Sequence, residues 1–146
     1  MKKILYLVPS DYDDLKEKGV LNLIKERDEG GYFDEVLTIH PFARISKIIK
    51  ISETNTLLQL GWKFKNSFLN KLFVTKIVGT CLILLRLIFV LPFRLKQEKI
   101  TIIRATDPYY MGLLGIFYSR LLNKPLVVTI HSDYDKRFLL DGPRGS

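Results

Sequence analysis

The fold is decided by Ile100 to Arg137, ITIIRATDPYYMGLLGIFYSRLLNKPLVVTIHSDYDKR. Its apolar, β-branched runs at Ile100–Ile103 and Leu126–Ile130 are typical of strands buried on both faces of a parallel sheet. Between them, Asp107 and Pro108 predict a helix start, because Asp caps orphan N–H groups and Pro suits the first helical position. The stretch therefore predicts a strand–helix–strand crossover in an α/β sheet.

The helix of this crossover is predicted over 109–122 and ends before Pro125. Its apolar residues follow the spacing of one buried helix face. We expect that face to consist of Leu113, Leu114, Phe117, Leu121 and Leu122.

Polar residues follow both strands, where open α/β sheets bind their ligands. The first group is Arg104, Thr106 and Asp107, and the second is His131, Ser132, Asp133, Tyr134 and Asp135. Two interpretations stay open for Asp107 and His131. They are site residues, or they are a helix cap and a hydrogen-bonded strand-end histidine.

The N-terminal part repeats this pattern. Ile4–Val8 predicts a first strand, followed by a polar turn that contains Ser10 and Asp11, and a helix that ends at Gly30–Gly31. A second strand is expected over 32–39, just before His40. Both histidines of the chain would then lie at the same sheet edge.

Residues 41–99 interrupt the α/β alternation and carry the charge surplus, with 11 Lys+Arg against 2 Asp+Glu. Ile45, Ile48 and Ile49 predict a short basic helix, and residues 54–61 a loop or an extra strand. A long helix is expected over 66–92, with Pro92 as its stop. Arg86 near its centre favours a core or interfacial helix over a membrane span.

Composition narrows the function class. The 146 residues suit one domain, 1–146, and Cys81 is expected to be a buried small hydrophobe. The N-terminal apolar run is too short for a signal peptide, which indicates a cytoplasmic protein. Motifs of dinucleotide, P-loop, serine-hydrolase and metal sites are missing, and the basic region has no RNA-binding signature, so no nucleic-acid partner is expected.

The tripeptide Asp-Tyr-Asp follows a predicted strand twice, at 11–13 and 133–135. Carboxylates separated by one residue can hold a divalent ion on a nucleotide diphosphate. Helix capping and turn formation are the alternative.

The segments RATDPYYMGLLG and NKPLVVTIHSDYDKRF resemble the N-terminal half of glycosyltransferase family 4 enzymes, which have two Rossmann-like domains in the GT-B arrangement. The likeness spans 1–141 in order and is sharpest over 104–138. It implies a Rossmann-like parallel sheet flanked by helices, as the acceptor-side half of a longer transferase. The donor domain, which in that family carries two glutamates with seven residues between them, is expected to be absent here.

The resemblance also implies site residues. His131 and Asp133 would be catalytic, in a cleft near the acceptor and the transferred sugar. The cleft is completed by Ser10, Asp11, His40, Arg104, Asp107, Tyr134 and Asp135. Because the family typically needs no metal, no metal or cofactor is expected beside the nucleotide-sugar donor.

We therefore expect transfer of a sugar to a lipid-linked saccharide or polysaccharide at the cytoplasmic membrane face. Cationic side chains would hold the protein on anionic lipid: Lys63, Lys65, Lys71 and Lys76. A solvated basic face without a partner is the alternative for these lysines. For the chain, the alternatives are a non-catalytic membrane-associated binding module and a metal-dependent transferase that uses Asp133 and Asp135. The oligomeric state is not predicted.

Overall fold

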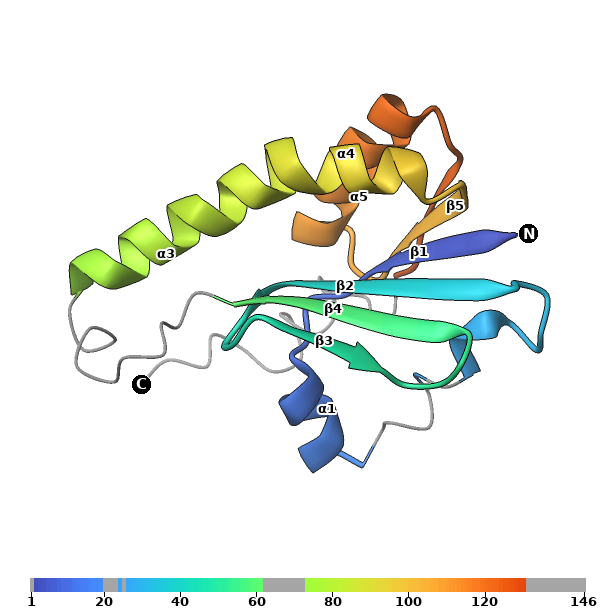
Figure 1. The fold of residues 1–146 in the computed structure, drawn as a ribbon, viewed down its shortest axis with the longest axis horizontal. Coiled ribbons are helices and arrows are strands. Elements are labelled where there is room, and N and C mark those ends of the chain that lie inside the picture. The colour runs from blue at the N-terminus through green and yellow to red at the C-terminus, as the bar shows by residue number, and fades with distance from the viewer. Residues whose placement is uncertain (1, 20–23, 25, 62–72, 131–146) are drawn as a thin grey trace, which may run out of the picture.

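The computed structural model describes residues 2–19, 24, 26–61 and 73–130. They form a six-stranded sheet of order β3-β4-β2-β1-β5-β6, in which only the pair β3–β4 is antiparallel (Figure 1). The predicted Rossmann-like α/β fold is confirmed. The strands are β1 (Lys3–Leu7), β2 (Glu35–Ala43), β3 (Lys47–Lys50), β4 (Asn55–Gly61), β5 (Ile100–Ala105) and β6 (Leu126–Val128).

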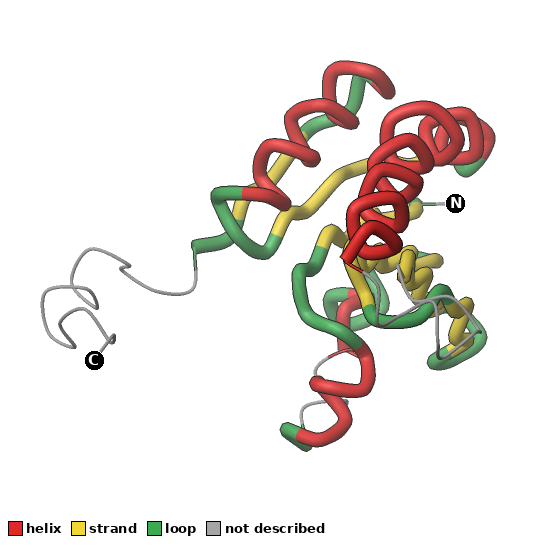
Figure 2. Tube along the Cα trace, turned by 90° about the vertical axis from the view of Figure 1, so that its left-hand side faces the viewer, coloured by secondary structure: helices red, strands yellow, loops and turns green. Residues whose placement is uncertain are grey.

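Helices lie on both sides of this sheet. One continuous helix consists of α3 (Phe73–Leu85), the π-helical turn η3 (Arg86–Val90) and α4 (Leu91–Gln97). With α5 (Tyr110–Leu122) it covers one face of the sheet (Figures 1 and 2). The short helix α1 (Tyr12–Glu17) and the 3-10 turn η1 (Glu26–Asp28) lie on the other side.

The two sheet faces differ in chemistry. The face under the long helix and α5, here called the apolar face, buries Leu5, Leu7, Ile39 and Ile103 in the main core. The opposite face, here called the polar face, carries Tyr6, Thr38, His40 and Gln59 beside Ile4 and Val36. Strand alternation separates these sets, because successive side chains point to opposite faces.

Strand β2 is longer than predicted and runs through His40 and Pro41. Pairing with β1 ends at Ile39, whose carbonyl accepts from Val8 N. Beyond that point no described strand lies on the β1 side of β2, so the missing N–H of Pro41 on that side breaks no ladder bond between described strands. The prediction that His40 follows the strand is wrong, because His40 lies inside β2.

Residues 47–50 form strand β3 instead of the predicted basic helix. Ile48 pairs with Leu58 and Ile49 with Leu57 in an antiparallel ladder. The spacing of three isoleucines fits a helix, but the β-branched pair fits a strand equally well, and pairing with β4 decides. The extra strand predicted as one alternative for 54–61 is confirmed as β4.

Pro92 does not end the long helix, which continues to Gln97. Pro92 lacks an N–H and its ring clashes with the carbonyl four residues earlier, so the preceding turn widens to π geometry, in which Leu91 N donates to Arg86 O. The usual α-helical donor to the carbonyl of Leu87 is Leu91 N, which donates to Arg86 O instead, and Pro92 has no N–H to replace it. The Tyr118 hydroxyl of α5 donates to this carbonyl instead, at 2.8 Å.

Helix α5 buries only part of the predicted face. Leu114 and Leu122 pack against the core, whereas Leu113 is 68% exposed and Phe117 and Leu121 are also exposed. The fully buried residues, among them Met111, Gly115 and Tyr118, were not predicted. A Cβ on Gly115 would lie 2.8 Å from Leu126 Cδ1, so glycine allows α5 to approach β6 closely. Cys81 is exposed rather than buried, because it lies on the outer side of α3.

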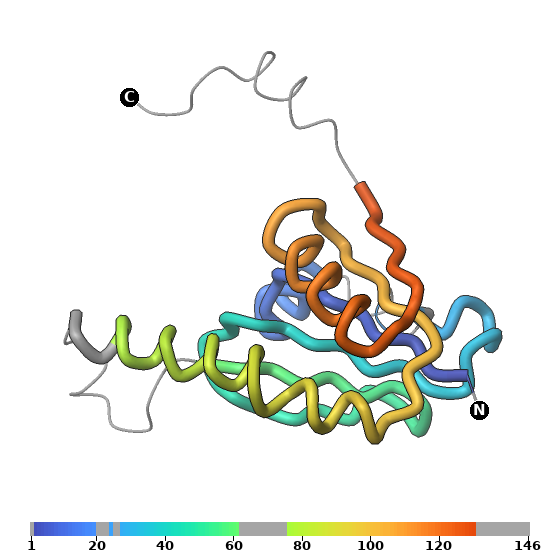
Figure 3. The backbone as a smooth tube through the Cα atoms, turned by 90° about the horizontal axis from the view of Figure 1, so that it is seen from above, coloured from blue at the N-terminus to red at the C-terminus, as the bar shows by residue number. Residues whose placement is uncertain are grey.

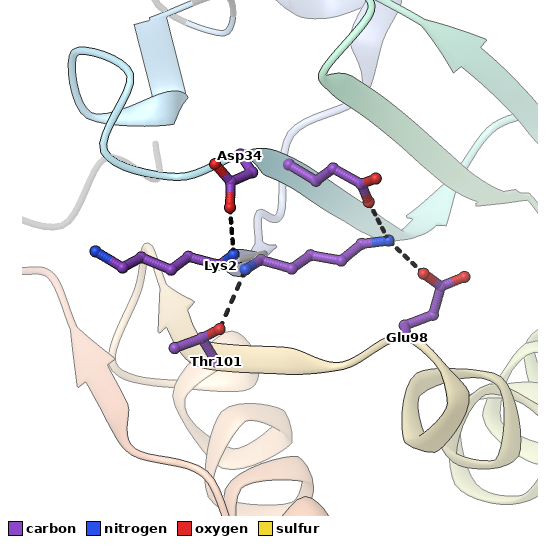
Figure 4. Close-up of polar contacts among 6 residues, drawn as sticks. Lys2, Asp34, Glu98 and Thr101 are labelled. Carbon is purple, nitrogen blue, oxygen red and sulfur yellow. Dashed lines mark hydrogen bonds and ion pairs between the residues drawn. The ribbon is translucent and has the colours of Figure 1, made fainter.

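At the amino edge of the sheet, Lys3 joins three elements (Figure 4). Its ammonium group lies 2.7 Å from Glu35 Oε2 and also contacts Glu98. Burial lowers the pKa of Lys3, but the hydrogen bonds to Glu35 and Glu98 raise it more, and the net shift is upward. Nearby, Lys2 N donates to Asp34 and Lys3 N donates to Thr101. Ion pairs of Lys3 with Glu35 and Glu98 therefore hold β1, β2 and the end of α4 together at this edge.

Candidate functional site

The carboxyl ends of β1, β2, β4 and β5 meet at the opposite edge of the sheet, where ligands bind in open α/β folds. Asp11 is the centre of the polar contacts there. Its Oδ1 accepts from Asp13 N at 3.2 Å and from Gln59 Nε2 at 2.6 Å, and its Oδ2 accepts from Arg44 N at 2.9 Å. Asp11 therefore joins the ends of three strands.

These contacts identify Asp11 as the N-cap of α1, which confirms the capping interpretation of the first Asp-Tyr-Asp element. Burial raises the pKa of Asp11. The hydrogen bonds from Arg44, Asp13 and Gln59 lower it by a larger amount, so the pKa lies below its usual value. The carboxylate is ionised at neutral pH and its oxygens are engaged inside the protein. Ser10, half-buried in the preceding bend, is the more accessible residue of this turn.

His40 is fully buried on the polar face, beside Gln59 in the neighbouring strand. In the described part of the chain, neither ring nitrogen has a hydrogen-bond partner. Burial and then the charge of Arg27 lower the pKa of His40 to about 4, against a smaller opposite effect of Asp11. His40 is therefore neutral at physiological pH and does not line the protein surface, contrary to its predicted place in an open cleft.

Arg104 lies within β5 rather than after it, and its side chain crosses the polar face. Its Nε donates to Thr129 Oγ1 at 3.0 Å, and its Nη1 contacts Tyr6 Oη and Glu29. Tyr6 donates to Glu29 Oε1 at 2.7 Å, and burial together with this bond raises the pKa of Tyr6 to about 12. Arg104 is thus held by neutral and anionic partners.

Arg27 of η1 approaches the same tyrosine from the other side, with its guanidinium carbon 5.3 Å from the ring centroid. Its Nη1 donates to Thr38 Oγ1 at 3.2 Å. Among the described residues it has no carboxylate partner, and burial lowers the pKa of Arg27 to about 10. Sequence patterns missed Tyr6, Arg27 and Glu29. The only available signal was the alternation in β1, which puts Tyr6 on the face opposite Leu5 and Leu7.

At the end of β5, Asp107 Oδ1 accepts from Tyr109 N at 2.7 Å, and α5 begins at Tyr110. Asp107 therefore makes a turn just before the helix, but the N-cap of α5 is Tyr109, whose side chain makes no capping hydrogen bond. The prediction that Asp107 is the helix cap is wrong, because the helix begins two residues later than Pro108 suggested. The remaining expected site residues lie outside the described residues: His131, Asp133, Tyr134, Asp135, Lys63, Lys65 and Lys71. Across the described ranges, no three His, Cys, Asp or Glu side chains are grouped closely enough to hold a metal ion.

A second candidate surface lies on the helices above the apolar face. By length and composition alone, the helix Lys76–Gln97 could cross a membrane. Only 28% of its most apolar stretch is buried inside the protein. Phe89 is 60% and Phe93 72% exposed. Lys76 is exposed near the start of the same helix.

This surface, here called the outer apolar surface, consists of exposed apolar side chains of the long helix and of α5. Figure 3 shows the backbones of these two helices seen from above. Exposed apolar patches of this kind mark protein or membrane contacts. Its members are Ile77, Val78, Leu82, Leu84, Leu85, Ile88, Phe89, Val90, Phe93, Tyr110, Leu113, Ile116, Phe117 and Leu121.

Comparison with known proteins adds the fold alone. No protein-family model matches the chain, and no curated protein matches it in sequence. Two crystal structures of the C-terminal domain of the PF1911 hydrogenase from Pyrococcus furiosus are similar in structure, each with a TM-score of 0.50. Their sequence identities are 13% and 16%, with 88% and 87% of this chain and 90% of each neighbour covered. This likeness supports the α/β fold and carries no information on activity.

Proposed function

We propose that the chain is the acceptor-side, Rossmann-like domain of a glycosyltransferase that works on a membrane surface. It would transfer a sugar from a nucleotide-sugar to a lipid-linked saccharide or polysaccharide at the cytoplasmic face. The outer apolar surface is the observation that supports this most, because a domain acting on lipid-linked acceptors has to dock on a bilayer. The chemistry of transfer rests on the family-like segments between Arg104 and Phe138.

The docking geometry follows from the sides of the long helix. Ile83, Leu87, Leu91 and Leu95 face the sheet, while Leu85, Phe89 and Phe93 face away from it. The outward residues can enter the interfacial region of a bilayer without loss of core contacts. Exposed cations on the same helix, Arg86, Arg94 and Lys96, would lie near anionic headgroups.

A second function, a non-catalytic membrane-associated module, is favoured by the state of the carboxyl edge. Asp11 is engaged as a helix cap, and His40 is buried in β2. Neither group is free to contact an acceptor. In the transferase proposal, the acceptor contacts therefore fall to His131 and Asp133, where His131 would orient or polarise a hydroxyl as the side chain that titrates near neutral pH.

The test is label transfer by the complete natural polypeptide. It is incubated with radiolabelled nucleotide-sugars and vesicles made from lipids of its own organism, and label is counted in the organic phase while vesicle flotation reports binding. We expect transfer by the wild type and at least tenfold less for His131→Ala. Phe89→Ser with Phe93→Ser should reduce vesicle binding at least tenfold, since each Phe loses part of a transfer energy of about 1.5–3 kcal/mol.

Tyr32→Ser is the matched control, because Tyr32 is an exposed aromatic residue outside the outer apolar surface. Vesicle binding without transfer from any donor would support the binding module. Equal binding of the Phe89/Phe93 variant and the wild type would overturn the docking surface. Unchanged transfer by His131→Ala would remove the proposed role of that histidine.

A further inference from the structure

A groove of about 450 Å³ lies between the long helix and the antiparallel strands β3 and β4. It lies on the apolar face of the sheet, where η3 and α4 form one wall and the edge strand β3 forms the other. Its volume is within the roughly 300–1,000 Å³ of ligand clefts.

The base of the groove is apolar. Leu58 and Leu60 of β4 and Leu91 of α4 belong to or pack against the main core, and Ile48 and Val90 form the exposed walls. Register places Ile48 beside Leu58, so both point to the same face. Gln59 lies between Leu58 and Leu60 in β4, but strand alternation turns its side chain to the polar face, where its amide donates to Asp11. The base therefore accommodates alkyl groups.

The helical side of the rim is cationic. Arg86 and Arg94 lie two turns apart on the helix, with Val90 between them. Lys47 of β3 pairs with Gln59, so its side chain starts from the other face of the sheet and is not counted among the rim cations. Within the described residues, no acidic side chain lines the groove and neither arginine has an ion pair. Guanidinium groups bind phosphate through parallel hydrogen bonds, which makes such a pair a fitting phosphate contact.

The groove also adjoins the outer apolar surface. Val90 belongs to both, and Phe89 and Phe93 neighbour its lining residues along the helix. A lipid molecule could pass from a bilayer under Phe93 into the groove with its alkyl chain in contact with apolar side chains throughout. Neither a nucleotide nor a peptide is matched here, because the base offers no free polar side chain for their amides or ring nitrogens.

We propose that this groove binds one anionic phospholipid, with an acyl chain along Leu58, Leu60 and Leu91 and its phosphate against Arg86 and Arg94. This inference rests on the membrane association in the proposed function and names the lipid class involved. It assigns the two arginines a binding role distinct from nonspecific attraction to a charged surface.

Binding of monomeric lipid tests the groove separately from bilayer docking. Dihexanoyl-phosphatidylglycerol and dihexanoyl-phosphatidylcholine are titrated into the complete polypeptide below their micelle concentrations, by calorimetry. We expect saturable binding of one phosphatidylglycerol per chain, and at least tenfold weaker binding of phosphatidylcholine. Arg86→Gln with Arg94→Gln should weaken phosphatidylglycerol binding at least tenfold.

The matched control is Lys16→Gln with Lys18→Gln, which removes the same charge from exposed positions at the end of α1, on the other side of the sheet. It should bind within twofold of the wild type. Ile48→Glu, at a position that is 67% exposed, tests the groove without disturbing the core and should also abolish binding. Circular dichroism verifies the fold of each variant.

Equal affinity for the two lipids, or wild-type affinity in the double arginine variant, would overturn the inference. A loss in the Lys16/Lys18 control as large as in the arginine variant would overturn it too, because it would show general electrostatic attraction. Monomer binding without vesicle binding would support the groove while contradicting bilayer docking. Vesicle binding without monomer binding would support bilayer docking and overturn the proposed lipid groove.

Discussion

The two faces of the sheet bury different chemistry. On the apolar face, the described core consists of aliphatic side chains such as Leu5, Leu7 and Leu87, together with Met111 and Tyr118. On the polar face, His40, Thr38 and Gln59 are buried beside apolar residues, and Arg27 and Arg104 flank Tyr6. The first face depends on packing and the second on hydrogen bonds and charge.

This difference separates the two candidate roles. A packed aliphatic core tolerates apolar residues on the outer side of its helices, since the sheet-facing residues already hold those helices in place. The polar face has a different requirement, because each buried polar group has to be hydrogen-bonded or uncharged. We therefore expect the apolar face to show large, pH-independent losses on mutation, and the polar face to make stability depend on pH.

The largest expected effect is that of Leu87→Ala on the apolar face. Leu87 is 2% exposed, and truncation of a buried leucine costs about 2–5 kcal/mol of unfolding free energy. Urea unfolding measures this loss, which should be the same at pH 7.5 and pH 5.5. Leu85→Ala, on the exposed side of the same helix, is the control and should change stability by about 0.5 kcal/mol or less. Equal losses for both would remove the distinction between the two sides.

The next effect is the pH dependence contributed by His40. The unfolded chain binds a proton at His40 near its ordinary pKa of 6.5, whereas the folded protein binds it only near pKa 4. Stability is therefore highest above pH 6.5 and falls as the pH decreases toward 4. The total loss is about 3 kcal/mol, at about 1.4 kcal/mol per pH unit of difference.

Urea unfolding of wild type and His40→Leu across this pH range measures the contribution. The difference in unfolding free energy between the two proteins should change by about 3 kcal/mol across this range, the contribution calculated above for His40. Parallel pH profiles would show that His40 is accessible to protons in the folded state. That result would make the polar face behave like the apolar one.

The smallest expected effect is that of Tyr118→Phe, at the polar exception on the apolar face. The variant removes the donor to Leu87 O, and an unsatisfied buried carbonyl costs about 1–3 kcal/mol. Burial raises the pKa of Tyr118, so its hydroxyl stays protonated and the loss should not vary between pH 6 and 9. A neutral substitution would mean that another donor or water serves that carbonyl.

The parts of the fold that sequence predicted are local. Strands β1, β5 and β6 and helix α5 were found because buried parallel strands are continuous apolar runs and the helix has clear start and stop residues. Strand β3 was missed because its pairing with β4 is a tertiary contact. The buried face of α5 was predicted only in part, because the helix is apolar on several sides and Gly115 allows one of them to approach β6 closely.

The site was predictable only in part for a similar reason. Asp11 was identified from its position after the first strand, but its partners Arg44 and Gln59 are 33 and 48 residues away in the chain. The contact of Arg104 with Tyr6 joins residues 98 apart. Such partners leave no spacing pattern. The burial of His40 was missed because Pro41 looked like a strand end.

The widened turn before Pro92 also has a consequence for the phase of the long helix. Its sheet-facing residues Ile83, Leu87, Leu91 and Leu95 are spaced by four, and at about 100° per residue this stripe would rotate by about 120° around a regular α-helix. A π turn absorbs roughly one extra residue and so cancels most of that rotation. The π turn therefore keeps the buried residues of the helix on one side. From Ile83 to Leu95, one side of the helix stays on the sheet and the other stays outward, both before and after Pro92.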